Sequence, residues 1–322
     1  MPETATLERI FSRAVRAPSS HNTQPWLFRF GKDWIELWAD RTRALPVNDP
    51  DDRELTISCG CALMSLRVAA AAENLGSEAA LLPDPDEEDL LARLDLGSAA
   101  DPALARLASF IDMRQTLRSS FDDRAIDAQD LAALIDAATA EGAWFVPLTS
   151  GEARSDAAAL VARGDAALWD NPSWRRELAQ WMHPRRRGDG ISLPWLALPA
   201  ARLVVRSFDM GGGVAAHDSQ LAEGSPLLAV LGTRGDTVHD RIAAGQALQR
   251  LLLSGVGMGL QASYLNQPVQ VDGLRPELAS LTGQDGAPQI LLRMGYSADR
   301  LKPSPRRPVE DVLAGADGDE PA

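Results

Sequence analysis

The amino-acid sequence predicts an α+β fold, a mixed α/β sandwich, for this chain of 322 residues. Helical and strand patterns alternate along it, but without the strict strand–helix–strand rhythm of a doubly wound sheet. In addition, two long Ala- and Leu-rich segments share a register when the chain is shifted by 185 residues, so that Gly60 aligns with Gly245 and Pro83 with Pro268. Because paired Gly and Pro positions coincide by chance less readily than paired Leu positions, this alignment favours internal duplication.

The first hundred residues contain clear helical and strand patterns. They predict a helix over the first 17 residues, a hairpin of strands 26–30 and 34–38, and a long helix over 52–75. The stretch 83–100 is acidic and interrupted by Pro83, Pro85 and Gly97, so we interpret it as a crossover or linker.

Regular patterns return after this stretch. We expect helices over 102–113, 127–140, 151–169 and 240–258, and strands over 144–148, 227–231, 262–265 and 289–294. Residues 170–224 have little periodicity and carry four prolines. Irregular segments this long are usually functional lids or disordered, so they form a candidate lid. We interpret the three glycines at 211–213 as a hinge within it.

The composition excludes several classes of protein. Apolar residues make up 45% and charged residues 24% of the chain, as in ordinary globular proteins. The net charge of −13 opposes binding to nucleic acid, and the short arginine runs at 185–187 and 306–307 do not form a basic stripe. We find no stretch approaching the ~20 apolar residues of a membrane span and no signal-peptide core in Met1–Phe11. These features predict a cytoplasmic protein that binds neither nucleic acid nor membrane.

Neither cysteine nor histidine spacing suggests a metal site. Cys59 and Cys61 are two residues apart, so on a helix their side chains point about 200° apart and are better interpreted as small buried groups. His183, His217 and His239 lack the spacing to Cys or carboxylates that metal sites require. We therefore expect no metal.

The most distinctive run is Ala17-Pro18-Ser19-Ser20-His21-Asn22-Thr23-Gln24-Pro25-Trp26, which joins a predicted helix to a predicted strand. It offers backbone donors, hydroxyls and amides between prolines that restrict the backbone. Such groups suit a flat polar ligand, although an Asx-rich turn after a helix stop would have the same composition.

Two arginine clusters suit a phosphate. In Arg114-Gln115-Thr116-Leu117-Arg118, a helical turn would place Arg114 and Arg118, four residues apart, on one face with the Thr116 hydroxyl nearby, and two guanidiniums with a hydroxyl suit a phosphate. Near the C-terminus, prolines flank Arg306 and Arg307. Taken alone, each cluster has solvated surface charge as its alternative interpretation.

Together these runs resemble the FMN-dependent nitroreductase family. The order Ala-Pro-Ser-Ser-x-Asn-x-Gln-Pro-Trp resembles its signature loop, and Arg114–Arg118 its phosphate-binding turn. The segment Gly259-Leu260-Gln261-Ala262-Ser263-Tyr264-Leu265-Asn266-Gln267-Pro268 resembles the strand that leads to the flavin N5 edge, and the C-terminal Arg-Arg-Pro also matches. The resemblance implies a nitroreductase-like fold with FMN as cofactor and NAD(P)H as electron donor.

The order of these motifs is reversed relative to ordinary members of the family. Here the Pro-Ser-Ser-x-Asn loop precedes the arginine turn, as in the fused, dormancy-associated Acg-type branch. This resemblance implies that one chain mimics the usual homodimer and holds one FMN. Residues 1–100 would form the first half and supply the loop. Residues 101–322 would form the second half, supply the phosphate and N5 contacts, and include the candidate lid 170–224. Whether the pseudo-dimer remains a monomer or forms a homodimer stays open.

Carried over by position, the resemblance implies a role for each motif residue. Arg114, Thr116 and either Arg306 or Arg307 would bind the FMN phosphate, with Gln115 in the same turn, and Arg118 the ribityl or pyrimidine edge. Pro18, Ser19, Ser20 and Asn22 would line the other side of the isoalloxazine. Leu265, Asn266 and Gln267 would present a backbone group near N5, where family members often have an acidic residue and a glycine instead.

The resemblance implies an FMN-dependent NAD(P)H oxidoreductase. Hydride would pass through flavin N5 in ping-pong order to a small-molecule acceptor such as a nitroaromatic or quinone, and no protein side chain would need to be catalytic. The alternative is a protein that binds or sequesters flavin under a closed lid without turnover.

Overall fold

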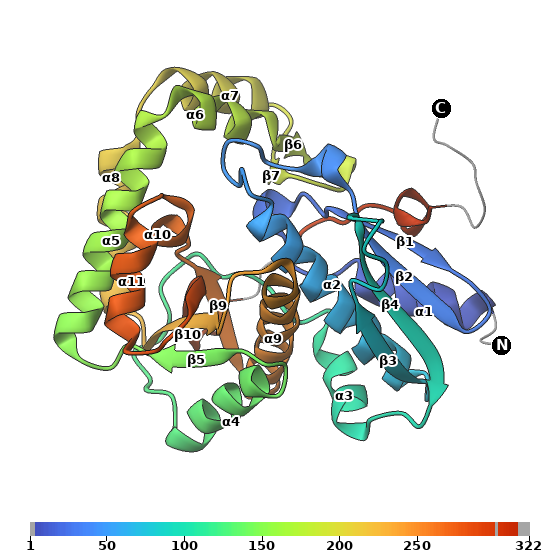
Figure 1. Ribbon diagram of the computed structural model, residues 1–322. Helices are drawn as coiled ribbons and strands as arrows, with labels where there is room; N and C mark the ends of the chain where they lie inside the picture. Colours follow the sequence, from blue (N-terminus) through green and yellow to red (C-terminus); the bar gives the residue numbers. More distant parts are fainter. Residues whose placement is uncertain (1–3, 300–301, 315–322) are drawn as a thin grey trace.

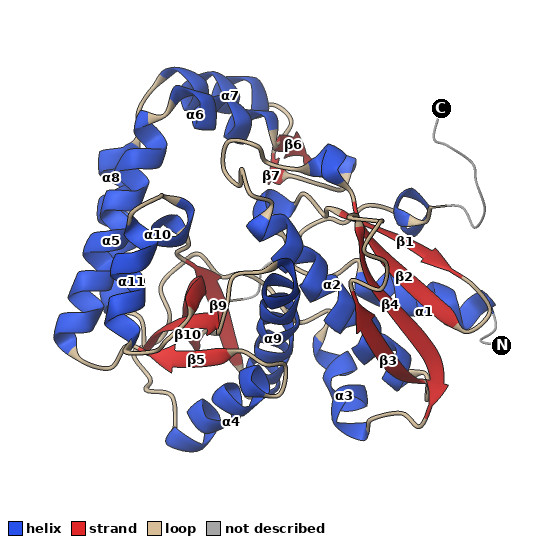
Figure 2. Ribbon diagram, in the orientation of Figure 1, coloured by secondary structure: helices blue, strands red, loops and turns tan. Residues whose placement is uncertain are grey.

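Two four-stranded antiparallel sheets lie on opposite sides of a central pair of helices, α2 (Arg53–Ala72) and α9 (Val238–Gly257) (Figures 1 and 2). The computed structural model describes residues 4–299 and 302–314. Both sheets pack against this helical centre, so the core has the layered α+β character that the sequence predicts.

The first sheet follows helix α1 (Thr4–Ala14). Its strands are β1 (Trp26–Phe30), β2 (Trp34–Ala39), β3 (Gly76–Leu81) and β4 (Leu90–Ser98), in the spatial order β1-β2-β4-β3. The interpretation of 83–100 as a linker is therefore wrong for its second part, because β4 pairs with both β2 and β3. The acidic residues hide an alternation in which Ala92 and Leu94 are buried while Asp95 is exposed.

The second sheet repeats this arrangement after helix α4 (Ala128–Thr139). Its strands are β5 (Trp144–Pro147), β8 (Leu227–Thr233), β9 (Leu260–Tyr264) and β10 (Ala287–Tyr296), in the spatial order β5-β8-β10-β9. Apart from shorter elements and the insertion described below, each half of the chain thus contains, in order, a helix, two strands, a long helix and two strands. In each sheet the fourth strand lies between the second and the third. Shared topology of this kind supports internal duplication.

The central helices meet at the two glycines that the sequence alignment pairs. A Cβ atom on Gly60 would collide with the Ile242 carbonyl and lie 3.0 Å from Gly245 Cα. A Cβ atom on Gly245 would collide with the Ile57 carbonyl and lie 2.8 Å from Gly60 Cα. Such reciprocal contacts between equivalent residues are characteristic of a twofold-related interface, here within one chain.

An insertion between β5 and β8 forms a cap, defined here as residues 151–224. It contains α5 (Gly151–Asp170), α6 (Pro172–Gln180), β6 (Met182–Pro184), β7 (Ile191–Leu193), α7 (Leu198–Ser207) and α8 (Gly211–Gly224). In the first half, a turn at 31–33 makes the equivalent connection.

The sequence suggested little regular structure over 170–224, and this expectation is wrong. Asn171 caps α6 by accepting hydrogen bonds from the Ser173 and Trp174 amides. The glycines at 211–213 begin α8 and do not form a hinge. The apolar side chains of this region pack within the cap itself, as Trp169 and Trp174 do in an edge-on contact, so no long periodic pattern was visible.

The remaining elements are short. They are α3 (Pro102–Leu107), α10 (Gln267–Gln270), α11 (Leu274–Thr282) and the 3-10 turns η1 (Ser20–Asn22), η2 (Arg41–Arg43), η3 (Ala108–Phe110), η4 (Arg185–Arg187) and η5 (Val309–Val312). The predicted helix over 102–113 is thus shorter than expected. The C-terminal segment returns to the first sheet, where Leu313 bridges to Phe28 at the edge of β1.

Helix α2 differs from one expectation drawn from the sequence. It is long and apolar enough to cross a membrane, whereas we expected no such stretch. Most of it is buried inside the protein, between α9, α1 and the first sheet, so it has the surroundings of a core helix. Within the described residues, no group of three or more His, Cys, Asp or Glu side chains is arranged to hold a metal ion.

Candidate functional site

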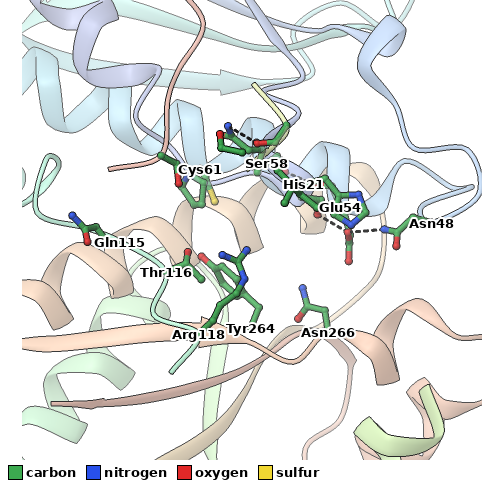
Figure 3. A pocket seen from close by; sticks show the side chains of 18 of the residues that line it. His21, Asn48, Glu54, Ser58, Cys61, Gln115, Thr116, Arg118, Tyr264 and Asn266 are labelled. Carbon is green, nitrogen blue, oxygen red and sulfur yellow. Dashed lines mark hydrogen bonds between the residues drawn. The ribbon is translucent and has the colours of Figure 1, made fainter. Parts of the chain in front are cut away.

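A cavity of about 600 Å³ lies between the two halves and the cap. Figure 3 shows its two sides. His21, Asn48, Glu54, Ser58 and Cys61 come from the first half, and Gln115, Thr116, Arg118, Tyr264 and Asn266 face them from the second. Its volume is within the range of cofactor sites, roughly 300 to 1,000 Å³.

Most of the residues predicted from the sequence lie together around this cavity. The lining includes Pro18, Ser19, Ser20, Asn22, Arg114, Gln115, Thr116, Arg118, Asn266, Gln267 and Arg306. Leu265 and Arg307 are not part of the lining. Leu265 is buried, and its N–H donates to the Leu291 carbonyl (2.9 Å). Arg307 donates instead to backbone carbonyls of Gln24 and Asp311.

The segment Arg114–Arg118 is extended, so the expectation of a helical turn is wrong. Thr116 bridges to Ala262 in β9, and the Leu117 N–H donates to the Ala262 carbonyl (2.9 Å). Tertiary pairing with an open strand edge therefore overrides the local pattern. An extended chain also places residues 114, 116 and 118 on one side, because side chains alternate along it.

The guanidiniums of Arg114, which is buried, and Arg306, which is half-buried, lie side by side at one end of the cavity. Arg114 Nη2 and Arg306 Nη2 both donate to the Arg16 carbonyl oxygen, at 3.2 and 3.1 Å. Arg306 also donates to Asn22 Oδ1 (3.0 Å). Within residues 4–299 and 302–314, neither Arg114 nor Arg306 forms a salt bridge, whereas Arg16 pairs with Asp112. The pair thus concentrates positive charge without a nearby carboxylate.

The surroundings of these arginines oppose their charge. Burial lowers the pKa of Arg114, and burial followed by the charges of Arg114 and Arg16 lowers the pKa of Arg306. In the described part of the chain, Arg114 Nε, Arg306 Nε and the Tyr264 hydroxyl are buried without hydrogen-bond partners. Unpaired buried donors beside like charges are costly, and an anion bound here would offset that cost.

The Pro-Ser-Ser-x-Asn loop is held in an unusual conformation. His21, Asn22 and Gln24 all have positive φ angles, which residues other than glycine seldom adopt. The Ser19 hydroxyl accepts from the Gln24 N–H (2.9 Å). The fully buried Gln24 side chain donates to the Gly188 carbonyl (2.9 Å) and accepts from the Arg307 N–H (2.9 Å). Gln24 therefore joins the loop to the cap and to the C-terminal segment.

Glu54 forms a second polar cluster in the lining, which the sequence did not indicate as a site. Its carboxylate accepts hydrogen bonds from the Ser20 hydroxyl (2.5 Å), Asn48 (3.2 Å) and Gln270 (2.8 Å). In the sequence Glu54 directly follows the run Asp49-Pro50-Asp51-Asp52-Arg53, which does not by itself indicate a ligand. The hydrogen-bonding residues come from distant segments, so only the tertiary structure could assemble the cluster.

The cap contributes to the wall of the cavity and is tied to the first half. Glu177 accepts hydrogen bonds from the Val47 and Asn48 amides, at 2.9 and 2.8 Å. Trp174 Nε1 donates to Asn48 Oδ1 (2.8 Å), and Arg43 pairs with Asp189. These contacts hold the cap over one side of the cavity.

Comparisons with known proteins give relatives along nearly the whole chain. No family model matches it. A Mycobacterium tuberculosis protein with the provisional name NAD(P)H nitroreductase is 32% identical over 321 residues, covering 97% of this chain and 92% of that protein. Another from the same organism, provisionally named NAD(P)H nitroreductase acg, is 27% identical over 329 residues and covers 97% and 98%.

A solved structure supports the fold. A nitroreductase-type protein from Anabaena variabilis has a TM-score of 0.51 with 11% identity, and the match covers 92% of this chain and 89% of that one. At this identity the likeness concerns the fold, and family membership follows from the sequence relatives. The chain therefore belongs to the nitroreductase family, in its Acg-type branch, and has the nitroreductase fold.

Proposed function

We propose that this protein is an FMN-dependent oxidoreductase that takes electrons from NAD(P)H and passes them in ping-pong order to a nitroaromatic, a quinone or another small acceptor. The observation that carries the proposal is the pair of neighbouring guanidiniums of Arg114 and Arg306, which share one carbonyl and form no salt bridge within the described part of the chain. A phosphate dianion would satisfy both. Both relatives described above are provisionally named NAD(P)H nitroreductases, and these names support the same activity.

Different residues of the cavity would contact different parts of FMN. Arg114, Thr116 and Arg306 would hold the phosphate of FMN, and Arg118 its ribityl chain or pyrimidine edge. The loop 18–22 would contact the opposite side of the ring system. Asn266 lines the cavity and would lie near N5. Leu265 would not make this contact, because its amide N–H donates to the Leu291 carbonyl. When bound, FMN supplies the hydride chemistry, and the protein supplies orientation and positive charge.

We also propose that residues 1–100 and 101–322 are the two halves of a pseudo-dimer that binds one FMN per chain. The equal strand orders of the two sheets and the reciprocal glycine contact support this division. The first half would supply the loop and the second the arginine segment. The region 170–224 would act as the lid, within the larger cap.

The experiment for FMN binding is a fluorescence titration of apoprotein with FMN. Arg306→Ala should weaken binding by about tenfold to a hundredfold, because each hydrogen bond to a charged group contributes about 1.5 to 3 kcal/mol. Arg106→Ala is the matched control, since Arg106 is exposed on α3. Equal affinities of the two variants would contradict the phosphate assignment.

The experiment for turnover is anaerobic addition of NADH or NADPH to the FMN-loaded protein. Bleaching of the flavin absorbance, followed by recovery when a quinone is added, is the expected result. Flavin that neither nucleotide bleaches would contradict a nicotinamide-driven enzyme.

The second candidate function is flavin sequestration without turnover. The cap contacts of Trp174, Glu177 and Asp189 favour it, because they hold the cap against the first half. Trp174→Phe removes the bond to Asn48 with little change of shape. If sequestration is the function, this variant should be bleached by NADPH faster than the wild type; equal and rapid bleaching of both proteins would favour the oxidoreductase.

A further inference from the structure

A pair of carboxyl groups lines the cavity on the side of the cap. Asp165 lies on α5 and Asp218 on α8, and both contribute to the lining. The single amide nitrogen Nε2 of Gln267 donates to Asp165 Oδ1 (3.1 Å) and to Asp218 Oδ2 (2.9 Å). One donor thus contacts both carboxyl groups, so each experiences the charge of the other.

The hydrogen bonding of this cluster is incomplete. Asp165 is 4% exposed, and its Oδ2 is buried without a hydrogen-bond partner. Gln267 Oε1 is likewise buried and unpartnered. Among the described residues, neither aspartate forms a salt bridge with Arg, Lys or His within 4.0 Å. Two acceptor atoms therefore lack a donor, and a proton on the carboxyl pair would supply one.

The two aspartates differ in their electrostatic surroundings. Burial raises the pKa of Asp218, but the hydrogen bond from Gln267 and the nearby charges of His217, Arg293 and Arg118 oppose this rise. Asp165 has no comparable positive neighbour among the described residues. Burial, and then the charge on Asp218, raises the pKa of Asp165 to about 7. Two carboxyl groups in such surroundings hold one proton between them, and Asp165 is the residue that carries it.

We propose that Asp165 and Asp218, bridged by Gln267, hold one proton that is delivered to the electron acceptor during its reduction, and that the substrates are acceptors which must take up a proton, quinones in particular. The inference rests on the proposed oxidoreductase function. Its geometric basis is that Gln267, which contacts both aspartates, follows Asn266 in the segment assigned to the N5 edge.

The reaction balances with a quinone and NAD(P)H. NAD(P)H gives up a hydride and becomes NAD(P)⁺, so one quinone oxygen gains a hydrogen together with two electrons. The second oxygen takes the proton whose bond to the Asp165 oxygen breaks. Hydroquinone leaves, and the carboxyl pair regains a proton from water.

The first test measures protonation directly, without turnover. Infrared difference spectra between about pH 6 and pH 8 should show, besides a contribution from Asp49, a protonated carboxyl band with a midpoint near pH 7. Asp165→Asn should remove this band and Asp156→Asn should retain it, since Asp156 is exposed on the same helix. Asp218→Asn removes the neighbouring negative charge, so the titration midpoint of the band should move to lower pH. Absence of the band from the wild type would overturn the proposal whether or not FMN binds.

The second test separates proton delivery from electron transfer. The FMN-loaded protein is reduced with dithionite and reoxidised either with a benzoquinone or with ferricyanide, which accepts electrons without protons. Asp165→Asn should slow reoxidation by the quinone by about a hundredfold, the usual size of a general-acid effect, and leave reoxidation by ferricyanide unchanged. The wild-type rate with quinone should fall as pH rises through about 7.

Equal slowing with both oxidants, or no slowing with either, would overturn proton delivery. Because dithionite replaces NAD(P)H here, a failure of nicotinamide to bleach the flavin would contradict the proposed function alone.

Discussion

At the scale of single residues, the loop 19–24 is a strained segment held by specific hydrogen bonds. Asn22 has a φ of 56°, and its side chain contacts both the cap and the C-terminal segment. Its Nδ2 donates to the Gly190 carbonyl (3.3 Å) in the cap and to the Pro305 carbonyl (3.2 Å), and its Oδ1 accepts from Arg306 (3.0 Å). Strain of this kind persists where the surroundings fix the backbone, and it concentrates at functional sites.

Two substitutions separate the backbone contribution of Asn22 from that of its side chain. Asn22→Ala should lower the free energy of unfolding by about 2 to 4 kcal/mol, because it loses the side-chain hydrogen bonds to Gly190, Pro305 and Arg306 and places an alanine in the left-handed region. Asn22→Gly loses the same bonds but accepts the positive φ, so it should be about 1 kcal/mol more stable than the alanine variant. Urea unfolding measures both. Equal losses would show that the backbone conformation is unimportant.

At the scale of elements, the crossing of α2 and α9 depends on the absence of side chains at one point. Gly60 and Gly245 allow the two backbones to approach so closely that Cβ atoms could not fit. Both helices carry apolar residues around most of their circumference, because each is surrounded by other elements. Both helices contribute residues to the lining of the cavity, so the width of the cavity depends on this crossing.

Gly245→Ala should therefore destabilise the protein by about 1 to 3 kcal/mol, the usual cost of overpacking. Gly212→Ala is the matched control. A Cβ atom on Gly212, in α8, meets nothing within 4 Å, so this change should leave stability unchanged or raise it by up to about 1 kcal/mol. The melting temperatures of both variants test the pair, and a Gly245→Ala protein as stable as the wild type would disprove the close-contact explanation.

At the scale of the whole molecule, carboxyl groups with opposite pKa shifts predict how stability varies with pH. Burial raises the pKa of Asp49 to about 6 and that of Asp165 to about 7, in each case assisted by a neighbouring carboxylate. A hydrogen bond from Arg9 lowers the pKa of Glu73. The pKa of Asp236 is also well below its usual range: burial opposes this, but hydrogen bonds from Arg275 and Gln289 outweigh it.

The stability of the protein should accordingly be greatest at about pH 4. Between about pH 4 and pH 7 the folded protein binds more protons at Asp49 and Asp165 than the unfolded chain does, so these groups reduce stability as pH rises. Below about pH 4, protonation removes the stabilisation from Glu73 and Asp236. Melting temperatures measured from pH 3 to pH 8 test this. Asp165→Asn should flatten the decline above pH 5, and an unchanged decline would contradict the assignment.

Local patterns in the sequence determined most of the core and most of the cavity lining. Periodicity predicted both central helices, the first hairpin and the strands β5, β8, β9 and β10. In each of these elements the apolar residues either lie on one buried face or are all buried. The sequence also identified the motif residues that line the cavity, from Pro18 to Arg306, because the family resemblance depends on short contiguous runs. Their predicted roles in binding FMN remain predictions.

Tertiary structure alone decided what depends on distant partners. Strand β4 forms because β2 and β3 pair with it, although acidic residues obscure its alternation. Arg114–Arg118 is extended because the edge of β9 accepts it, and Leu265 lies outside the cavity because its amide bonds to β10. The Asp165–Gln267–Asp218 cluster joins three elements of the second half. Long-range hydrogen bonds and burial outweigh local preference at these positions, and no short window of sequence contains both partners.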